Sequence, residues 1–138
     1  MLEEFFKLVV FNYVFSNGDA HLKNFSLIQS EFGDYTLSKA YDLMSTVLHT
    51  PNESDIALDL YEGDMESKFY AKYGHFGRPD FEELAERIGL IPKRTQYIVD
   101  TILSQQNEIL AMIYSSFLSD EAKEKYIHHY KDKVKRFR

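Results

Sequence analysis

The chain has 138 residues, no cysteine and a formal net charge of -6 at pH 7. This length suits a single domain, and the lack of cysteine excludes a disulfide framework, a thiolate metal site and a cysteine nucleophile. The acidic balance argues against a general attraction to nucleic acid or anionic membranes, and no window approaches the roughly 20 apolar residues of a membrane-spanning helix.

The N-terminus lacks the pattern of a secretory signal. Two glutamates follow Leu2 where a signal would carry positive charge, and Lys7 and Asn12 interrupt the apolar stretch. We therefore expect a cytoplasmic protein in a reducing compartment, with no membrane attachment.

The first predicted element is a helix over residues 2–15. This stretch is apolar on nearly every face, which is typical of a helix inside a protein. Ser16, Asn17 and Gly18 then supply turn formers and backbone freedom, so the helix should end there and lead into a loop over residues 17–24.

A short β-hairpin is predicted next, over residues 25–39. Its two β-prone runs, 25–29 and 35–39, flank a turn that contains Gly33. Residues 41–64 lack sustained helical periodicity, so we expect a long surface loop with an extended stretch at 56–61. Such loops are usually functional in compact domains.

The rest of the chain, residues 65–138, is predicted to be a helical subdomain. A first helix covers 65–73 and ends at Gly74, and a second runs from Asp80 to Ile88, with Asp80 and Glu83 in a capping-box arrangement. The fold class is therefore mainly α with one small β-hairpin.

Two longer helices complete this subdomain. Pro92 opens the first, and Ser119 caps the second, which has acidic residues in its first turn and basic residues near its end. The apolar stripe of the first should pack against other helices, and it comprises Ile98, Ile102, Ile109, Met112, Ile113 and Phe117. The stripe of the second comprises Ala122, Tyr126, Tyr130, Val134 and Phe137.

Residues 17–24, Asn-Gly-Asp-Ala-His-Leu-Lys-Asn, hold the side chains that point to chemistry. Phosphoryl transfer needs a carboxylate to orient the attacking hydroxyl and oxygen ligands to hold magnesium on the phosphates. Asp19 and Asn24 lie five positions apart, as the catalytic Asp and the metal-binding Asn do in protein kinases. Asp42 follows Asn24 by 18 positions, with the hairpin between them.

The run Asn-Gly-Asp-Ala-His-Leu-Lys-Asn-Phe-Ser, followed by Tyr-Asp-Leu-Met-Ser-Thr from Tyr41, resembles the active site of HipA-like serine/threonine kinases. That family is the toxin half of bacterial toxin-antitoxin pairs. The resemblance implies the C-terminal lobe of a kinase-like fold that uses ATP and Mg²⁺. It makes Asp19 the catalytic residue and Asn24 and Asp42 the metal ligands.

The same resemblance assigns two further residues of the catalytic loop, 17–24. His21 lies in an Asp-x-His-x-x-Asn pattern that is similar to the catalytic loops of lipid kinases, where the histidine lies near the transferred phosphate. Lys23 is expected to assist catalysis and ATP binding by neutralising phosphate charge. The metal-binding segment is 41–46, and beyond it the likeness is one of architecture, with the family's helical lobe matching 65–138.

The lobe that clamps ATP in a complete kinase is not expected within this chain. Only 18 residues precede Asp19, and the six glycines form neither G-x-G-x-x-G nor a P-loop. The chain is either a fragment of a longer kinase or a small subunit that completes its site with a partner. We therefore expect little activity from the chain alone, and an apolar face that invites a partner or self-association.

The site residues also have simpler interpretations. Asp19 and Asn24 are common turn formers, and Asp42 is a residue type that caps helices. Ser45 and Thr46 occupy the place where an activation segment begins, but their hydroxyls are equally suited to capping a helix.

No catalytic role is expected for the remaining histidines. His49 and His75 stand alone, and His128 with His129 is predicted to be a solvated pair on the last helix. The basic end, 131–138, is explained by its apolar stripe and the helix dipole, so direct contact with nucleic acid is not expected.

Two functions follow from these observations. The first is the catalytic lobe of a serine/threonine kinase that transfers the γ-phosphate of ATP to a hydroxyl of a protein substrate, which the family resemblance suggests is a translation component. The second is a non-catalytic binding module that docks an antitoxin-like protein or an N-terminal kinase lobe. The three intact residues Asp19, Asn24 and Asp42 favour the first, and the missing ATP clamp favours the second for this chain by itself.

Overall fold

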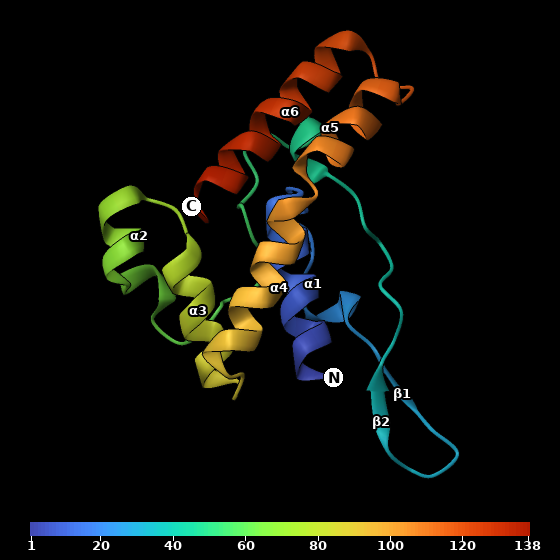
Figure 1. Cartoon of the computed structure of the whole chain (residues 1–138), viewed down its shortest axis with the longest axis vertical. Coiled ribbons are helices and arrows are strands. Elements are labelled where there is room, and N and C mark those ends of the chain that lie inside the picture. Colours follow the sequence, from blue (N-terminus) through green and yellow to red (C-terminus); the bar gives the residue numbers. More distant parts are fainter.

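Helix α1 (Leu2–Val14) lies at the centre of the fold in the computed structural model, which describes residues 1–138 (Figure 1). Its buried apolar residues fall at three- and four-residue steps, so they form one face. Those residues are Phe6, Val9, Val10, Tyr13 and Val14. Helix α4 (Pro92–Ser104) packs along α1, and α6 (Asp120–Lys135) contacts it near its C-terminal end, where Phe15 stacks on Tyr130 with ring centroids 5.5 Å apart.

The other helices cover this central pair. Helices α2 (Lys68–Tyr73) and α3 (Arg78–Arg87) lie together on one side of α4, whereas α5 (Gln106–Ser115) pairs with α6 at the opposite end of the molecule (Figure 1). The chain is thus mainly helical, as the sequence predicts. No helix combines the length and the apolar character needed to cross a membrane.

Aromatic rings join α1 to α3 and to the end of the chain. The ring centroid of Tyr13 lies 4.9 Å from that of Phe81, and the ring of Phe81 lies 5.0 Å from that of Phe137. All three side chains are fully buried, and the Tyr13 hydroxyl donates a 2.7 Å hydrogen bond to the carbonyl of Phe76. Because truncating a buried Phe typically costs about 3–5 kcal/mol, this cluster is a major source of stability.

Strands β1 (Leu27–Gln29) and β2 (Tyr35–Leu37) form the predicted antiparallel hairpin, with Leu27 opposite Leu37 and Gln29 opposite Tyr35. The hairpin projects away from the helices (Figure 1). Its exposed apolar side chains continue into the segment that follows β2, and they comprise Leu27, Ile28, Phe32, Tyr35, Tyr41, Leu43 and Met44.

The long loop predicted over residues 41–64 is present. Only 3-10 turns at Thr46–Leu48 and Asp64–Glu66 interrupt it, and the stretch 56–61 forms no strand. Asp64 is buried and anchors the end of the loop by accepting a 2.7 Å hydrogen bond from the backbone N–H of Leu60.

The exit from α1 falls at the predicted turn formers Ser16, Asn17 and Gly18. Of these three residues, Ser16 adopts the left-handed conformation, with φ 57°. Gly18 is needed for space, because a Cβ at this position would collide with the backbone oxygen of Ser54 and approach the carboxylate of Glu53. The glycine therefore permits the close approach of residues 53–54 to the loop 17–24.

Two predicted helix starts are shifted. Helix α3 begins at Arg78, so Asp80 is not its N-cap but lies in the first turn, where its carboxylate accepts a 2.9 Å hydrogen bond from the N–H of Gly77. Helix α2 begins at Lys68, because the Ser67 hydroxyl caps it by accepting from the N–H of Tyr70.

The single helix predicted from Pro92 to Phe117 is wrong. Gln105 separates α4 from α5, so α4 packs on α1 while α5 packs on α6. Of the predicted stripe, Ile98, Ile102 and Ile113 are buried, but Met112 is 71% exposed and Phe117 lies outside the helix and is fully exposed. The predicted start of α6 is confirmed, since the Ser119 hydroxyl accepts a hydrogen bond from the N–H of Ala122.

Candidate functional site

Asn24 and Asp42, 18 residues apart in the chain, are joined by a direct hydrogen bond. The Asn24 amide nitrogen donates to Asp42 Oδ2 across 2.7 Å. Asn24 ends the 3-10 turn Leu22–Asn24, and Asp42 follows the hairpin in a left-handed conformation with φ 55°. The hairpin therefore turns the chain back on itself and brings the two predicted metal ligands into contact.

A second set of hydrogen bonds joins the metal-binding segment to the start of the catalytic loop. The Asn17 amide nitrogen donates to the Asp42 carbonyl at 3.1 Å and to Asn12 Oδ1 at 3.0 Å. The N–H of Gly18 donates to the Thr46 hydroxyl at 2.9 Å. Because Asp19 directly follows Gly18, the loop that carries Asp19 lies beside the segment that carries Asp42.

Asp19 and His21 lie together on the catalytic loop. The Asp19 side chain is 61% exposed, and its carboxylate oxygen lies 3.8 Å from His21 Nε2, a distance that allows only a weak contact. The carboxylate of Asp19 makes no hydrogen bond within the chain, so its oxygen atoms are available to a ligand.

Lys23 contributes its backbone to the site, while its side chain is exposed. The Tyr41 hydroxyl donates to the Lys23 carbonyl at 3.0 Å. Since a hydroxyl has one proton, the Ser26 hydroxyl donates the 2.7 Å bond that joins it to Tyr41. Tyr41, which directly precedes Asp42, is therefore held against Lys23, which directly precedes Asn24.

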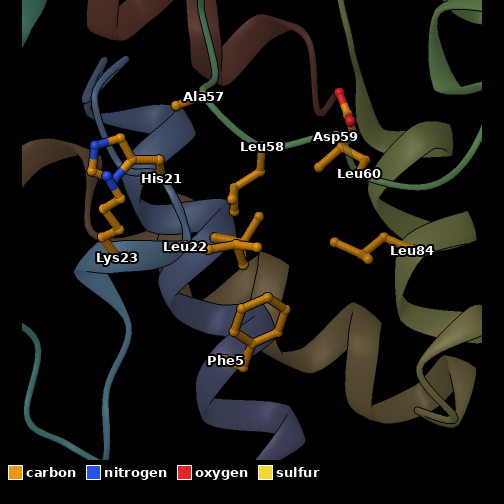
Figure 2. A pocket seen from close by; sticks show the side chains of 10 residues that line it. Phe5, His21, Leu22, Lys23, Ala57, Leu58, Asp59, Leu60 and Leu84 are labelled. Atoms are coloured by element: carbon orange, nitrogen blue, oxygen red, sulfur yellow. The ribbon is translucent and has the colours of Figure 1, made fainter.

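An apolar pocket of about 540 Å³ opens beside the catalytic loop (Figure 2). His21 and Lys23 lie at one end of it and Leu60 and Leu84 at the other, with Leu22 between them. Asp19, Asn24 and Asp42 do not line this pocket. The polar site and the apolar pocket thus share only the loop between Asp19 and Asn24.

The oxygen atoms of the Asn24 and Asp42 side chains suit a magnesium ion. Asn24 Oδ1 is buried and has no hydrogen-bond partner, and Asp42 Oδ1 makes no hydrogen bond. An amide oxygen and a carboxylate oxygen are hard ligands, and Mg²⁺ commonly takes one or two carboxylates and completes its shell with water and phosphate oxygens. No group of three or more His, Cys, Asp and Glu side chains in the chain could hold a metal by itself.

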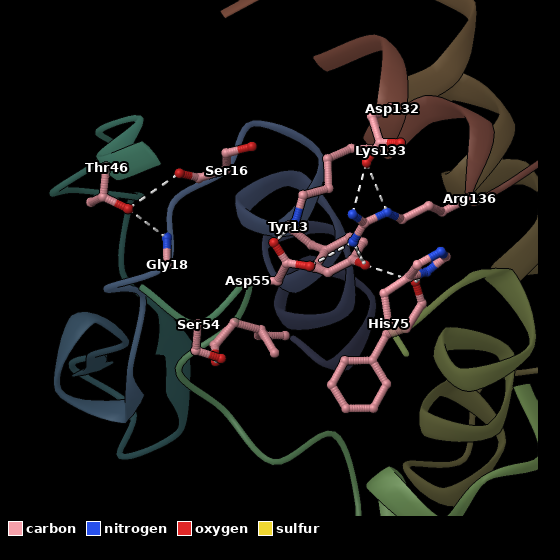
Figure 3. A network of polar contacts seen from close by, with 12 residues as sticks. Tyr13, Ser16, Gly18, Thr46, Ser54, Asp55, His75, Asp132, Lys133 and Arg136 are labelled. Carbon is pink, nitrogen blue, oxygen red and sulfur yellow. Dashed lines mark hydrogen bonds and ion pairs between the residues drawn. The ribbon is translucent and has the colours of Figure 1, made fainter. Parts of the chain in front are cut away.

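Behind the catalytic loop lies a partly buried ionic network, in which Lys133 is buried and Asp55 is half-buried (Figure 3). Asp55 pairs with Lys133 Nζ at 2.7 Å and with Arg136 Nη1 at 2.6 Å, and the same Arg136 nitrogen donates to the Tyr13 hydroxyl at 2.7 Å. Since the Ser54 carbonyl next to Asp55 touches Gly18, this network holds the back of the loop against α1 and α6.

Burial and the neighbouring charges together shift the pKa values of these groups. It lowers the pKa of Lys133 to about 8, and the neighbouring Asp55 carboxylate offsets only part of that effect. Burial would raise the pKa of Asp55, but Lys133 and Arg136 lower it below its usual value. Burial also raises the pKa of Tyr13, against the opposing effect of Arg136. The network is therefore two cations around one carboxylate, at a cost in desolvation.

The simpler interpretations do not account for the contacts of Asn24 and Asp42, whereas Asp19 lies in a turn, as its simpler interpretation expects. Asp42 caps no helix, because the 3-10 turn that follows begins after Ser45 and has no side-chain cap. The Asn24 side chain donates a hydrogen bond to Asp42, 18 residues away, and makes none within its own turn. Thr46 is buried and fully hydrogen-bonded, which does not suit a phosphorylation site.

The other histidines lie apart from this site. His49 is exposed after the 3-10 turn, and His75 is half-buried among the rings of Phe69 and Tyr73. On α6, His128 is exposed and His129 is half-buried, with a pKa lowered by burial and by its neighbours His128 and Lys133.

Comparison with known families agrees with the resemblance in the motifs. The family model described as HipA-like C-terminal domain matches residues 1–110, so this chain belongs to that family. A protein of Haemophilus influenzae named "Putative kinase" is 28% identical over 123 residues, which cover 83% of this chain and 36% of that protein. "Putative kinase Y4dM" of Sinorhizobium fredii is 45% identical over 56 residues, 41% of this chain and 14% of that protein. The chain thus spans well under half the length of either relative.

Sequence reasoning missed the residues that connect the site. Asn17 and Thr46 belong to the motifs, but nothing local in the sequence indicates their long-range bonds. Lys133 did leave a signal, because it falls three residues after Tyr130 and one before Val134, on the apolar face of α6. A charged residue at such a position predicts an ionic partner, which here is the half-buried Asp55.

Proposed function

We propose that this chain is the catalytic lobe of a serine/threonine protein kinase that transfers the γ-phosphate of ATP to a hydroxyl of a protein substrate. The observation that carries the proposal is the contact between Asn24 and Asp42, which leaves an unpartnered amide oxygen beside a carboxylate. Membership of the HipA-like C-terminal domain family and the names of the two relatives support the same class of reaction.

Each site residue then has a defined task. Asp19 accepts a hydrogen bond from the substrate hydroxyl and takes its proton as the oxygen attacks the γ-phosphorus. A new O–P bond forms, the bond to the β-phosphate oxygen breaks, and ADP leaves with the electron pair. Asn24 and Asp42 hold Mg²⁺, which neutralises charge on the phosphates when it is bound.

His21 and Lys23 are proposed to act at the edge of the same site. His21 lies next to Asp19 and can donate a hydrogen bond to a phosphate oxygen. The exposed Lys23 ammonium is long enough to approach the phosphates, where a point charge of this kind lowers the cost of accumulating negative charge.

The exposed hairpin supports the need for a second lobe. Leu27, Ile28 and Phe32 are more than half exposed, and they lie on the hairpin that separates Asn24 from Asp42. An apolar surface next to the phosphate site suits an ATP-binding lobe that closes over the nucleotide. Phosphate clamping depends on that lobe, so the 138 residues alone should transfer phosphate slowly or not at all.

The test is a reconstitution. The chain is fused to, or mixed with, the ATP-binding lobe of a longer HipA-like protein, and transfer from radiolabelled ATP to protein is measured with and without Mg²⁺. Asp19→Asn and Asp42→Asn should each lower the rate about 100-fold or more, since each removes a group that acts in the transition state. His49→Ala, an exposed change outside the site, should leave the rate unchanged.

Full activity of the reconstituted Asp42→Asn protein would show that Asp42 is not a metal ligand and would end this assignment. Full activity of Asp19→Asn would equally remove Asp19 from the chemistry. Both variants keep the shape of the side chain, so a loss of folding is not expected to obscure the result.

A second function is favoured by the apolar surfaces. The pocket beside Leu22 and the exposed hairpin would serve a binding module that docks an antitoxin-like protein or a kinase lobe without turnover. Under this alternative, the reconstituted protein would bind its partner equally well with Asp19→Asn and show no Mg²⁺-dependent transfer.

A further inference from the structure

The Thr46 side chain lies at the junction of the catalytic loop and the metal-binding segment. Its hydroxyl accepts a 2.9 Å hydrogen bond from the N–H of Gly18 and donates a 3.3 Å bond to the carbonyl of Ser16. The backbone N–H of Thr46 donates to the same Ser16 carbonyl at 3.0 Å. These three bonds, shown in part in Figure 3, bridge 28 to 30 residues of chain and are buried.

The chemistry of this contact requires a hydroxyl. One side chain must both accept from an N–H and donate to a carbonyl, which threonine and serine can do and valine cannot. The contact also satisfies Gly18, whose N–H is buried, and an unpaired buried N–H is costly. Thr46 is thus matched to its position by its hydroxyl and not only by its size.

Asn17 makes the second tie between the same two segments. Its amide nitrogen donates to the carbonyl of Asp42 and to Asn12 Oδ1, and the side chain is buried. Asp42 itself has a left-handed backbone conformation, which costs a non-glycine residue free energy and persists only when its surroundings impose it. The bond from Asn17 holds the carbonyl of Asp42 itself, and the bonds of Thr46 hold the chain four residues further on, so together they supply that constraint.

We propose that Thr46 and Asn17 are positioning residues, which fix the carboxylate of Asp42 against Asn24 and hold this pair beside the loop that carries Asp19. This inference rests on the proposed function, because it takes Asn24 and Asp42 as the metal ligands. Neither residue touches the metal or the phosphates, so each acts through Asp42 and Gly18. It follows that the buried Thr46 hydroxyl is a structural group and not an acceptor of phosphate.

The contact can be tested in the 138-residue chain without any assay of activity. Amide hydrogen exchange followed by NMR should show Gly18 protected in the wild type and exchanging roughly tenfold faster in Thr46→Val, because the isosteric change removes its acceptor. Thr46→Ser keeps the hydroxyl and should restore protection. Thr101→Val is the matched control, since the hydroxyl of Thr101 is exposed and bonds only within α4.

The positioning role is tested by titrating Mn²⁺, a paramagnetic stand-in for Mg²⁺, and following the broadening of resonances around Asn24 and Asp42. Thr46→Val and Asn17→Asp should each weaken binding roughly tenfold, as changes to groups that orient metal ligands do. Thr46→Ser should bind within about twofold of the wild type, because the hydroxyl is retained. If Thr46→Val does not fold, Asn17→Asp provides a second test, since it removes the amide N–H groups that donate to Asp42 and to Asn12.

The possible failures are distinguishable. A wild type that binds Mn²⁺ at Asn24 and Asp42, with unchanged affinity in Thr46→Val and Asn17→Asp, would overturn the positioning role and leave the proposed function intact. A wild type that shows no broadening at these residues would overturn the proposed function and the positioning role together. Protection of Gly18 that survives in Thr46→Val would disprove the contact itself.

Discussion

The buried Lys133 makes a quantitative prediction about stability and pH. Its side chain is 3% exposed, pairs with Asp55 at 2.7 Å and lies with its ammonium 4.0 Å from the centre of the Tyr13 ring. Despite these favourable contacts, burial holds its pKa near 8, against 10.5 for an exposed lysine. The charged form is therefore less favourable in the folded protein than in the unfolded chain.

The direction of the pH dependence follows from proton binding. Between the two pKa values the unfolded chain binds more protons at Lys133 than the folded protein does, so stability rises as the pH rises through that range. With folded and unfolded values of about 8 and 10.5, this one group should add about 2 kcal/mol to the free energy of unfolding between pH 7 and about pH 9.5. At pH 7 Lys133 is mostly charged in the folded protein, so the folded state carries the full free-energy cost of removing its ammonium from water.

Lys133→Met isolates this effect because it removes the titrating group and keeps a long apolar stem. Asp55 remains paired with Arg136, so the variant should be as stable as the wild type at pH 7 or more stable. Urea unfolding of both proteins at several pH values then gives the difference directly. This difference should shift by about 2 kcal/mol in favour of the wild type by about pH 9.5, since all other groups titrate in both proteins.

Lys125→Met is the matched control on the same helix, because Lys125 forms an exposed ion pair with Glu121. Its stability should follow that of the wild type at every pH, since exposed pairs contribute little. Parallel curves for the wild type and Lys133→Met would show that Lys133 titrates as an exposed lysine does, and would refute the claim that burial lowers its pKa.

Four further changes test other parts of the structure. Asp55→Asn should cost about 3 kcal/mol or more in urea unfolding, because it leaves the buried Lys133 charge without its partner. Gly18→Ala should cost about 1–3 kcal/mol in the same measurement, because its methyl group would displace the backbone of Ser54. Phe81→Ala should lower the free energy of unfolding by about 3–5 kcal/mol. Asn24→Ala should weaken Mn²⁺ binding, measured by NMR line broadening, roughly tenfold or more with little change in stability, since the contact it loses is exposed; equal affinity would remove Asn24 from the metal site.

The local elements of the fold were predictable because their signals are local. A stretch that is apolar on nearly every face indicated α1, the Ser119 hydroxyl marked the start of α6, and the turn at Gly33 indicated the hairpin. The missed features depend on packing. Periodicity continues across Gln105, but α4 and α5 pack on different partners, so one predicted helix is two in the structure.

The candidate site likewise combines features that the sequence predicts with features that depend on tertiary packing. The sequence by itself predicted which side chains could do chemistry, because the runs that carry Asp19, Asn24 and Asp42 resemble the active site of a known family. Only the tertiary structure decided how those side chains are held, since the Asn17–Asp42, Gly18–Thr46 and Asp55–Arg136 contacts join residues 25, 28 and 81 positions apart. Such contacts form when the folded chain brings distant segments together, and no local preference of the backbone records them.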